Sequence, residues 1–273
     1  MESNGGQPKI SIVTPSFNQG EFIRECIESV LSQGYDDLEH IVIDNCSSDE
    51  TIGVLKSYPH LRWISEPDQG QSDALNKGFQ MATGDLIGWL NADDYYLPGC
   101  FEKMVPFARE NPQGDVLYGD YRRIDLEGRV LQVRCELDYD LFMLKYVPHL
   151  YIVPPAMFFR RLVFADGNRF DVSYRYALDF EFVLRLALKG YTFCHLSAIL
   201  TDFRVHPGST SVSYKNEVRQ AHDRAVLQHD EFLRRVPPAV QRTTLLALRG
   251  AARAKRYTLK ALKGYYFRQW SEK

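Results

Sequence analysis

Two adjacent carboxylates, Asp93 and Asp94, follow the apolar run DLIGWL, which is typical of a buried strand. Like charges at the end of a strand repel each other and need a positive charge to balance them. A hard divalent cation such as Mg²⁺ or Mn²⁺ meets this need, because it binds one or two carboxylates and takes substrate phosphate oxygens as further ligands. The dipeptide taken alone favours a simpler interpretation, in which it starts a turn and helps to cap the next helix.

Polar segments follow three more predicted strands: TPSFNQG (14–20), DNCSSD (44–49) and EPDQGQSD (66–73). In the second segment, Asp44 can accept a hydrogen bond from a ribose hydroxyl or a base N–H, although taken alone it favours a helix cap. The carboxyl ends of parallel strands meet at one edge of a sheet, where α/β proteins bind ligands. Four polar strand ends at this edge therefore favour a nucleoside diphosphate with its metal. The sequence has neither a G-x-G-x-x-G fingerprint nor a Walker lysine loop.

The elements that must position these residues alternate along the first 110 residues. Apolar spacing predicts strands at 9–15, 39–44, 61–65 and 85–90 and helices at 21–34, 47–58, 71–82 and 101–110. Ser47 and Glu50 fit a capping box for the second helix. This alternation predicts an α/β fold with a Rossmann-like, mostly parallel central sheet flanked by helices.

The pattern changes after residue 114. A strand–turn–strand unit is expected at 116–134, a helix at 176–190 and an extended segment at 191–206. From about Tyr214 the chain is expected to be helical to its end, with a break at Pro237 and Pro238. The fold prediction thus includes a helical C-terminal tail.

Composition narrows the classes of protein. The chain has 273 residues, of which 45% are hydrophobic and 25% charged, so it can bury a sizeable core. A net charge of −2 argues against a general polyanion binder, and no nucleic-acid partner is expected. Five scattered cysteines without C-x-x-C spacing favour a reducing compartment. With no signal-peptide pattern and no bilayer-spanning apolar run, the expected location is cytoplasmic.

Four segments, taken in order, carry a resemblance to a known family: ISIVTPSFNQGEFIRECIESVLSQ, HIVIDNCSSDET, SEPDQGQSDALNKGFQMATGDLIGWLNADDYYLPG and YALDFEFVLRLALKGY. Together they resemble family 2 glycosyltransferases with a GT-A fold, over roughly residues 9–212. Such enzymes move a sugar from a nucleotide-sugar to an acceptor hydroxyl with inversion, usually with Mn²⁺ or Mg²⁺. The resemblance implies a catalytic domain at 1–212, with a donor-binding half (9–110) and an acceptor half (111–212), followed by an extension at 213–273.

The resemblance also implies roles for individual residues. The nucleotide-sugar would contact Pro15, Ser16, Asn18, Asp44, Ser72, Asn76 and Asp93. Asp94 and His206 would hold the metal. Asp179 would be the general base, and the positive end of its predicted helix favours an ionised carboxylate there. Glu181, two positions along, is the competing carboxylate and points to a different face of the helix.

The expected partners follow from the same resemblance. The donor would be a UDP-, GDP- or dTDP-sugar, and the acceptor a glycan or lipid-linked molecule in cell-surface glycan or polysaccharide assembly. No Q-x-x-R-W motif occurs, which argues against a processive synthase. The alternatives are a nucleotide-sugar-binding protein without transfer activity and a nucleotidyltransferase. The second would normally carry a Gly-rich loop with Arg or Lys after the first strand, and TPSFNQG lacks one.

Three positions depart from the family pattern. Leu75 stands where an arginine is common, so this position offers no charged contact to the base edge. Asn91 replaces the more common acidic residue of the metal motif and lowers the charge of the site. Leu178 replaces the usual glutamate before the general base.

The C-terminal tail is strongly basic. Residues 242–273 contain nine Lys or Arg and one acidic residue, Glu272, which gives a net charge of +8. Leucine and aromatic residues, among them Trp270, are interleaved with these cations. One interpretation is a helix that lies peripherally on the inner face of an anionic membrane. The alternative is a helix packed on the catalytic domain, or on a second subunit in a homodimer, with a solvated basic face.

Overall fold

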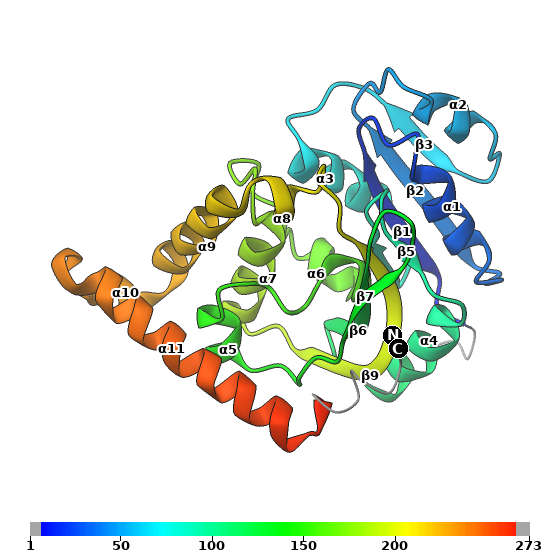
Figure 1. The fold of residues 1–273 in the computed structure, drawn as a ribbon. Helices are drawn as coiled ribbons and strands as arrows, with labels where there is room; N and C mark the ends of the chain where they lie inside the picture. The colour runs from blue at the N-terminus through cyan, green and yellow to red at the C-terminus, as the bar shows by residue number, and fades with distance from the viewer. Residues whose placement is uncertain (1–6, 266–273) are drawn as a thin grey trace.

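The structure is a computed structural model that describes residues 7–265. Arg268, Trp270 and Glu272 of the basic tail lie outside the described residues. The N-terminal half contains four parallel strands in the order β3-β2-β1-β4. They are β1 (Ile10–Ser16), β2 (Leu38–Asp44), β3 (Arg62–Ser65) and β4 (Leu86–Trp89). Figure 1 shows these strands in blue and cyan with their connecting helices.

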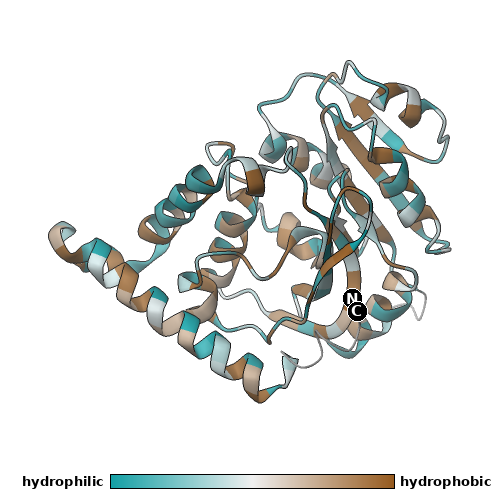
Figure 2. Cartoon of the chain, in the orientation of Figure 1, coloured by the Kyte–Doolittle hydropathy of each residue, from teal (hydrophilic) through white to brown (hydrophobic). Residues whose placement is uncertain are grey.

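Helices cover both faces of these four strands. They are α1 (Ile23–Leu31), α2 (Thr51–Lys56), α3 (Gln71–Met81) and α4 (Cys100–Glu110). Alternate strand residues face opposite sides: Val13 packs with α3, whereas Ile12 packs with α1 and α4. Because both faces are covered, β1, β2 and β4 are buried almost throughout and mostly apolar, and they contribute to the hydrophobic centre visible in Figure 2.

The second half of the sheet is mixed. β8 (Met157–Arg160) lies antiparallel between β4 and β6 (Val116–Ile124), and β6 in turn pairs in parallel with β9 (Phe193–Arg204). β7 (Val130–Arg134) forms the expected hairpin with β6, and the short β5 (Tyr95–Tyr96) pairs with β9. The predicted α/β architecture is confirmed. An unbroken run of neighbouring parallel strands occurs only within β1–β4 among the described residues.

The helices of the second half of the chain pack around the second half of this sheet. They are α5 (Leu141–Tyr146), η1 (Pro154–Ala156), α6 (Arg161–Ala165), α7 (Leu178–Leu188), α8 (Thr210–Ser213), α9 (Lys215–His229), α10 (Glu231–Arg235) and α11 (Pro238–Leu262). α7 buries Phe180 and Phe182 in the core, where the Phe182 ring stacks on Phe170 at 4.0 Å between centroids.

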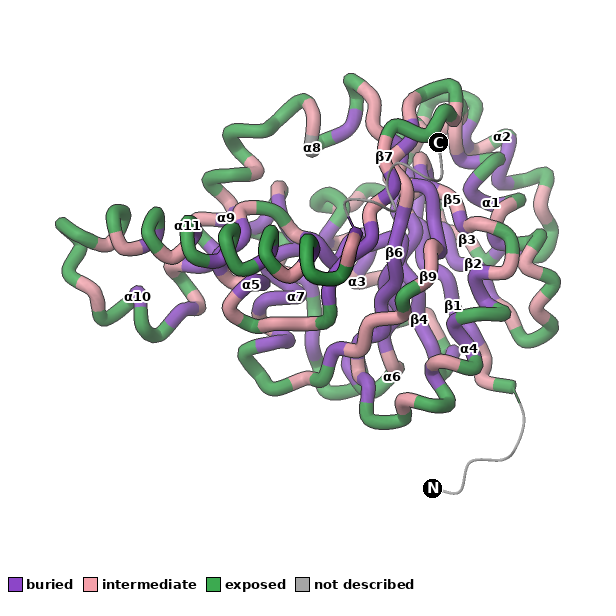
Figure 3. Tube along the Cα trace, turned by 60° about the horizontal axis from the view of Figure 1, so that its bottom comes forward, coloured by how far each residue is buried: buried purple, intermediate pink, exposed green. Residues whose placement is uncertain are grey.

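The long helix α11 begins at Pro238, which occupies its first turn, so the predicted break at the proline pair is confirmed. α11 packs along α5, and its outer side is exposed, as Figure 3 shows in green. In the part of the chain that the structure describes, no helix is both long and apolar enough to cross a membrane.

The predicted capping box at the start of α2 is wrong. Glu50 occupies the N-cap position and makes no capping bond with its side chain. Ser47 bonds instead to the side chain of Asp44 and to the backbone N–H of Asn18. The Ser47 hydroxyl therefore bonds to the loop after β1. That loop is distant in sequence, so the local spacing of Ser47 and Glu50 does not reveal this contact.

Candidate active site

The ends of β1, β2 and β3 meet at one edge of the sheet, as their spacing predicted. The strand register places Ser16 beside Asp44, and Asp44 beside Ser65. Asp44 is fully buried and accepts hydrogen bonds from Ser47 N–H (2.9 Å), Ser47 Oγ (2.5 Å) and Ser65 Oγ (2.7 Å). Three donors satisfy most of the acceptor capacity of this carboxylate, and one acceptor direction remains on Oδ1.

The loop after β1 is tied to the loop after β2. Asn18 has a left-handed backbone (φ 51°), and its side-chain oxygen accepts the Ser48 N–H at 2.9 Å. Pro15 and Ser16 are buried at the strand end, and the Ser16 hydroxyl has no partner among the described residues. The loop therefore has a fixed shape and one buried hydroxyl still able to bond a ligand.

Asp93 and Asp94 occupy different environments despite being adjacent. Asp94 is 1% exposed, and it accepts the Arg204 backbone N–H at 2.9 Å and the Asn91 side-chain amide at 3.0 Å. Burial, together with the neighbouring charge of Asp93, raises the pKa of Asp94 well above its ordinary value. Asp93 is partly exposed, and its Oδ2 lies 3.2 Å from His206 Nε2. Asp93 is thus the carboxylate of the pair that can reach a ligand.

Arg204 lies beside the acidic pair, and its charge is the smallest of the influences on the pKa of Asp94, which it lowers. Its side chain is 4% exposed, donates from Nε to the Asp93 carbonyl at 3.0 Å and forms an ion pair with Glu25. The guanidinium lies 5.3 Å from the Phe22 ring centroid and 5.6 Å from that of Tyr95. Sequence analysis missed this residue, although it stands only two positions before His206 in FRVH.

The hydrogen bonds of Asn91 explain why an amide stands here in place of the acidic residue of the family pattern. Its carbonyl oxygen accepts from Trp89 Nε1 at 2.8 Å and from Gln71 Nε2 at 2.9 Å, while its NH₂ donates to Asp94. An ionised aspartate could accept the first two bonds but could not donate the third. Trp89 is 2% exposed and lies in the hydrophobic core.

His206 faces Asp93 in a defined orientation. The Gly208 N–H donates to Nδ1 at 3.2 Å, which leaves the ring proton on Nε2, directed at Asp93. Carboxylate and imidazole are both ligands used by divalent metals, so the pair would fit such an ion if the ring proton moved from Nε2 to Nδ1 and the Gly208 bond were released. Between residues 7 and 265 no three His, Cys, Asp or Glu side chains form a metal cluster. A metal here would need substrate oxygens as its remaining ligands.

Asp179 lies at the start of α7 without an ion-pair partner in the described part of the chain. Its Oδ1 accepts the Phe180 N–H at 2.8 Å. The side chain is partly accessible but closely surrounded by protein, and this burial raises the pKa of Asp179. Glu181, by contrast, is buried and bonded to Arg185 (2.8 Å) and His229 (3.0 Å). Of the two carboxylates, Asp179 is therefore the one with a free oxygen.

Ser72 and Asn76 are engaged elsewhere. Ser72 donates to the Tyr174 carbonyl at 3.2 Å, and Asn76 forms two bonds with the backbone of Phe170, at 2.8 and 2.9 Å. These bonds hold α3 against the segment that leads into α7. They give both side chains a structural role, so we leave them out of the donor site proposed below.

Known structures with this arrangement of strands and helices define the class. Staphylococcus aureus TarS 1–349, in complex with UDP-GlcNAc, matches 88% of this chain and 71% of its own with a TM-score of 0.65 at 18% identity. The mannosyltransferase PcManGT from Pyrobaculum calidifontis, in complex with GDP-Man and Mn²⁺, matches 94% of this chain and 76% of its own (TM-score 0.64, 16% identity). The fold is the GT-A fold of glycosyltransferases.

Sequence comparison gives the family. The profile of glycosyl transferase family 2 matches residues 11–166. A glycosyltransferase of Rickettsia typhi, RT0329, is 27% identical over 233 residues, which cover 81% of this chain and 71% of the relative. The chain belongs to glycosyl transferase family 2, as its motifs predicted.

Proposed function

We propose that this glycosyltransferase moves a sugar from a nucleotide-sugar to an acceptor hydroxyl with inversion at the anomeric carbon. The observation that carries the proposal is the carboxylate of Asp179, which has an oxygen without a hydrogen bond among the described residues. The same domain carries Asp44, Asp93 and His206 at one edge of its sheet. The donor is a UDP-, GDP- or dTDP-sugar. Structural neighbours crystallised with UDP-GlcNAc and GDP-Man support this class of donor.

In this proposal the sheet edge holds the donor. Asp44 is fully buried and fixes Ser47 and Ser65 at the strand end where the base or ribose binds, and the unpartnered Ser16 hydroxyl bonds the nucleotide. Asp93 and His206 hold Mn²⁺ or Mg²⁺, which supplies positive charge to the leaving diphosphate. Asp94 positions the site without contacting the metal, because its oxygens are bonded to Arg204 and Asn91. This arrangement assigns the direct metal contact to Asp93 in place of Asp94.

Asp179 acts on the acceptor. A raised pKa makes a carboxylate a stronger base, and the one N–H bond from Phe180 leaves an oxygen able to take the proton of the acceptor hydroxyl. The backbone N–H groups at the start of α7 oppose the rise in the pKa of Asp179, because they favour the ionised carboxylate. The acceptor is a glycan or a lipid-linked molecule in surface glycan assembly.

Asp179→Asn tests the proposal, because it keeps the shape of the side chain and removes its basicity. The variant should bind the nucleotide-sugar normally and lose transfer by about a hundredfold or more. Nucleotide release from UDP-, GDP- and dTDP-sugars with Mn²⁺ measures turnover, and thermal shift measures binding. Glu181→Gln is the matched control and should retain turnover with lower stability. Binding without turnover in the wild-type chain would favour the alternative of a nucleotide-sugar-binding protein.

A further inference from the structure

The Phe22 ring lies against both His206 and Arg204, which are separated only by Val205 at the end of β9. Its centroid is 5.1 Å from that of the His206 ring, with 41° between the planes, and 5.3 Å from the Arg204 guanidinium. Phe22 is half-buried at the N-cap position of α1. One aromatic ring from a distant part of the chain therefore contacts both the histidine of the Asp93–His206 pair and the buried arginine near it.

The backbone fixes the position of Phe22. Its N–H donates to the Gln19 carbonyl at 3.0 Å, and its own carbonyl accepts the Cys26 N–H at 3.3 Å. The Gln19 N–H donates in turn to Thr51 Oγ1, at the start of α2, at 2.9 Å. Because the chain is bonded on both sides of Phe22, the ring offers a fixed surface to its neighbours.

Arg204 bonds three segments that are distant from one another in sequence. Its Nε donates to the Asp93 carbonyl at 3.0 Å, its Nη1 donates to the Leu126 carbonyl at 2.8 Å, and its Nη2 forms an ion pair with Glu25. Leu126 lies in the turn between β6 and β7, and Glu25 lies in the first turn of α1. The side chain is 4% exposed, so a change of orientation would leave a buried charge without its partners. The guanidinium therefore has one stable position.

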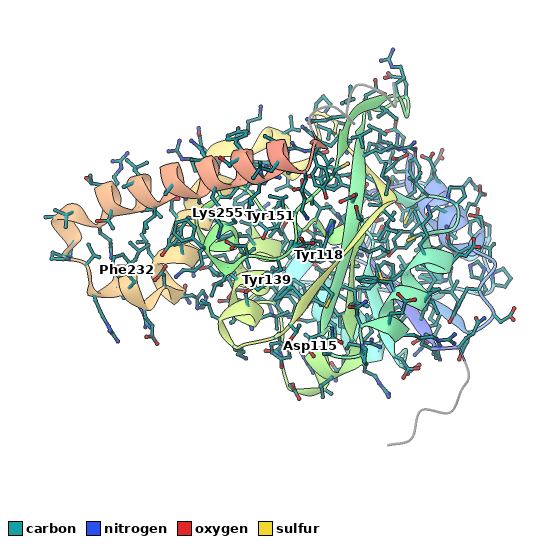
Figure 4. All side chains as sticks on the ribbon, turned by 90° about the horizontal axis from the view of Figure 1, so that it is seen from below. Asp115, Tyr118, Tyr139, Tyr151, Phe232 and Lys255 are labelled. Atoms are coloured by element: carbon teal, nitrogen blue, oxygen red, sulfur yellow. The ribbon has the colours of Figure 1, made fainter. Side chains whose placement is uncertain are left out.

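These contacts act on both members of the Asp93–His206 pair. Arg204 holds the backbone of Asp93, and Phe22 holds the ring of His206, while Asp93 Oδ2 and His206 Nε2 lie 3.2 Å apart. The contacts that orient a metal ligand matter to function, because their loss typically lowers metal affinity or activity 10- to 100-fold. Phe232 and Asp115, both labelled in Figure 4, line two pockets elsewhere on the molecule, and neither pocket includes Phe22 or Arg204.

We propose that Phe22 and Arg204 are positioning residues that hold the Asp93–His206 pair in the orientation needed to bind a divalent cation. This inference rests on the proposed function, which assigns Asp93 and His206 to the metal. Phe22→Leu isolates the role of the ring, because leucine keeps an apolar side chain at this half-buried position. Phe22→Tyr keeps the ring and is the conservative variant. Phe107→Leu, which removes a half-buried ring from α4, is the matched control.

The His206 Nε2 proton tests the proposal with neither metal nor donor present. Bonded to Asp93, it should give an NMR signal protected from exchange with water, assigned by its loss in His206→Gln. Phe22→Leu should shorten the lifetime of this proton about tenfold, the equivalent of one lost hydrogen bond, and Phe22→Tyr should restore it. Phe107→Leu should leave it unchanged. An absent signal in the wild type, or an unchanged lifetime in Phe22→Leu, would overturn the proposal.

Arg204→Lys tests the second positioning residue. Lysine keeps the charge that pairs with Glu25 but has no Nε donor for the Asp93 carbonyl, so the lifetime of the His206 proton should shorten here too. An unchanged lifetime would overturn the role of Arg204. Thermal unfolding checks that this variant is folded, and the Phe22 variants test the proposal independently of its stability.

Metal binding separates this inference from the proposed function. With UDP, GDP or dTDP present in turn, Mn²⁺ should broaden the His206 ring signals of the wild type, and Phe22→Leu should need about tenfold more Mn²⁺. Equal Mn²⁺ requirements in the two proteins would overturn the positioning role. If the proton lifetimes change as expected but Mn²⁺ broadens His206 in neither protein, positioning of the pair is supported and only its assignment to the metal is contradicted.

Discussion

At the scale of residues, burial separates the roles of two neighbouring carboxylates. Asp93 is partly exposed beside His206, whereas Asp94 is bonded to Arg204 and Asn91 inside the protein. Asp93→Asn should therefore lower metal-dependent nucleotide release by about a hundredfold with little change in melting temperature. Turnover against Mn²⁺ concentration is the measurement, with the exposed Asp36→Asn as control.

Asp94→Ala should show the opposite result to Asp93→Asn, with its main effect on stability. It leaves the Arg204 N–H and the Asn91 amide without an acceptor, and each unpaired buried group costs about 1–3 kcal/mol. Chemical denaturation should thus detect a clear loss of stability in this variant and none in Asp93→Asn. If Asp94→Ala instead unfolds like the wild type and loses only its Mn²⁺ dependence, the original assignment of Asp94 as metal ligand is correct.

Asn91 is predicted to be required as an amide. Asn91→Asp removes the donor to Asp94 and adds a second carboxylate beside it, so it should lower the free energy of unfolding by about 1–3 kcal/mol at pH 7. The loss should shrink as the pH falls, because protonation removes the repulsion and restores a donor. Denaturation curves at pH 7 and pH 5 measure this change. Asn216→Asp, at an exposed position on α9, should show no such dependence.

At the scale of elements, apolar periodicity predicted the strands β1–β4, the β6–β7 hairpin and α7 to within a few residues. It missed β5, β8 and α5, which are short and depend on pairing or packing with distant segments. Arg204 was missed for the same reason. Its partners Glu25 and Asp93 are more than 100 residues away in sequence, so no local spacing could reveal the contact.

The β2 strand carries a buried carboxylate that should control stability in acid. Glu39 accepts from Ser11 Oγ (2.5 Å), Thr83 N–H (2.6 Å) and Arg62 Nη1 (2.6 Å). Burial opposes its ionisation, but these bonds outweigh burial and lower the pKa of Glu39 from 4.5 to about 2. A depressed carboxyl pKa stabilises the fold above the unfolded-state value and loses that effect as the pH falls through the folded-state value.

Glu39→Gln should accordingly cost about 3 kcal/mol at pH 7, the equivalent of the pKa shift. The difference from wild type should decline from about pH 4.5 and vanish near pH 2. Urea denaturation over this range is the measurement, and the exposed Glu110→Gln serves as control. A difference that stays constant with pH would show that the ionised form of Glu39 does not stabilise the strand.

At the scale of the whole molecule, five of the seven cations in the described part of the basic tail form ion pairs with the rest of the protein. Ion pairs join α11 to the segment between β7 and α5: Lys255–Asp140 (2.5 Å), Arg256–Glu136 (2.5 Å), Lys260–Glu136 (2.9 Å) and Lys263–Asp138 (2.7 Å). Arg249 pairs with Asp223 of α9. Of the alternatives that the sequence left open, the described structure therefore shows a helix packed on the catalytic domain.

Removing α11 should for this reason destabilise the enzyme. A chain that ends at Val236 loses the buried Leu245 and Ala252 and leaves Glu136 without its two cations. Breaking a buried ion pair from one side costs about 3–5 kcal/mol, so the shortened chain should unfold at lower urea and expose apolar surface to a fluorescent dye.

The full chain should stay in the soluble fraction when mixed with anionic vesicles at physiological salt, since five described cations of the tail are already paired. Flotation of the full chain under these conditions, with normal stability of the shortened one, would show that the tail serves a membrane surface instead.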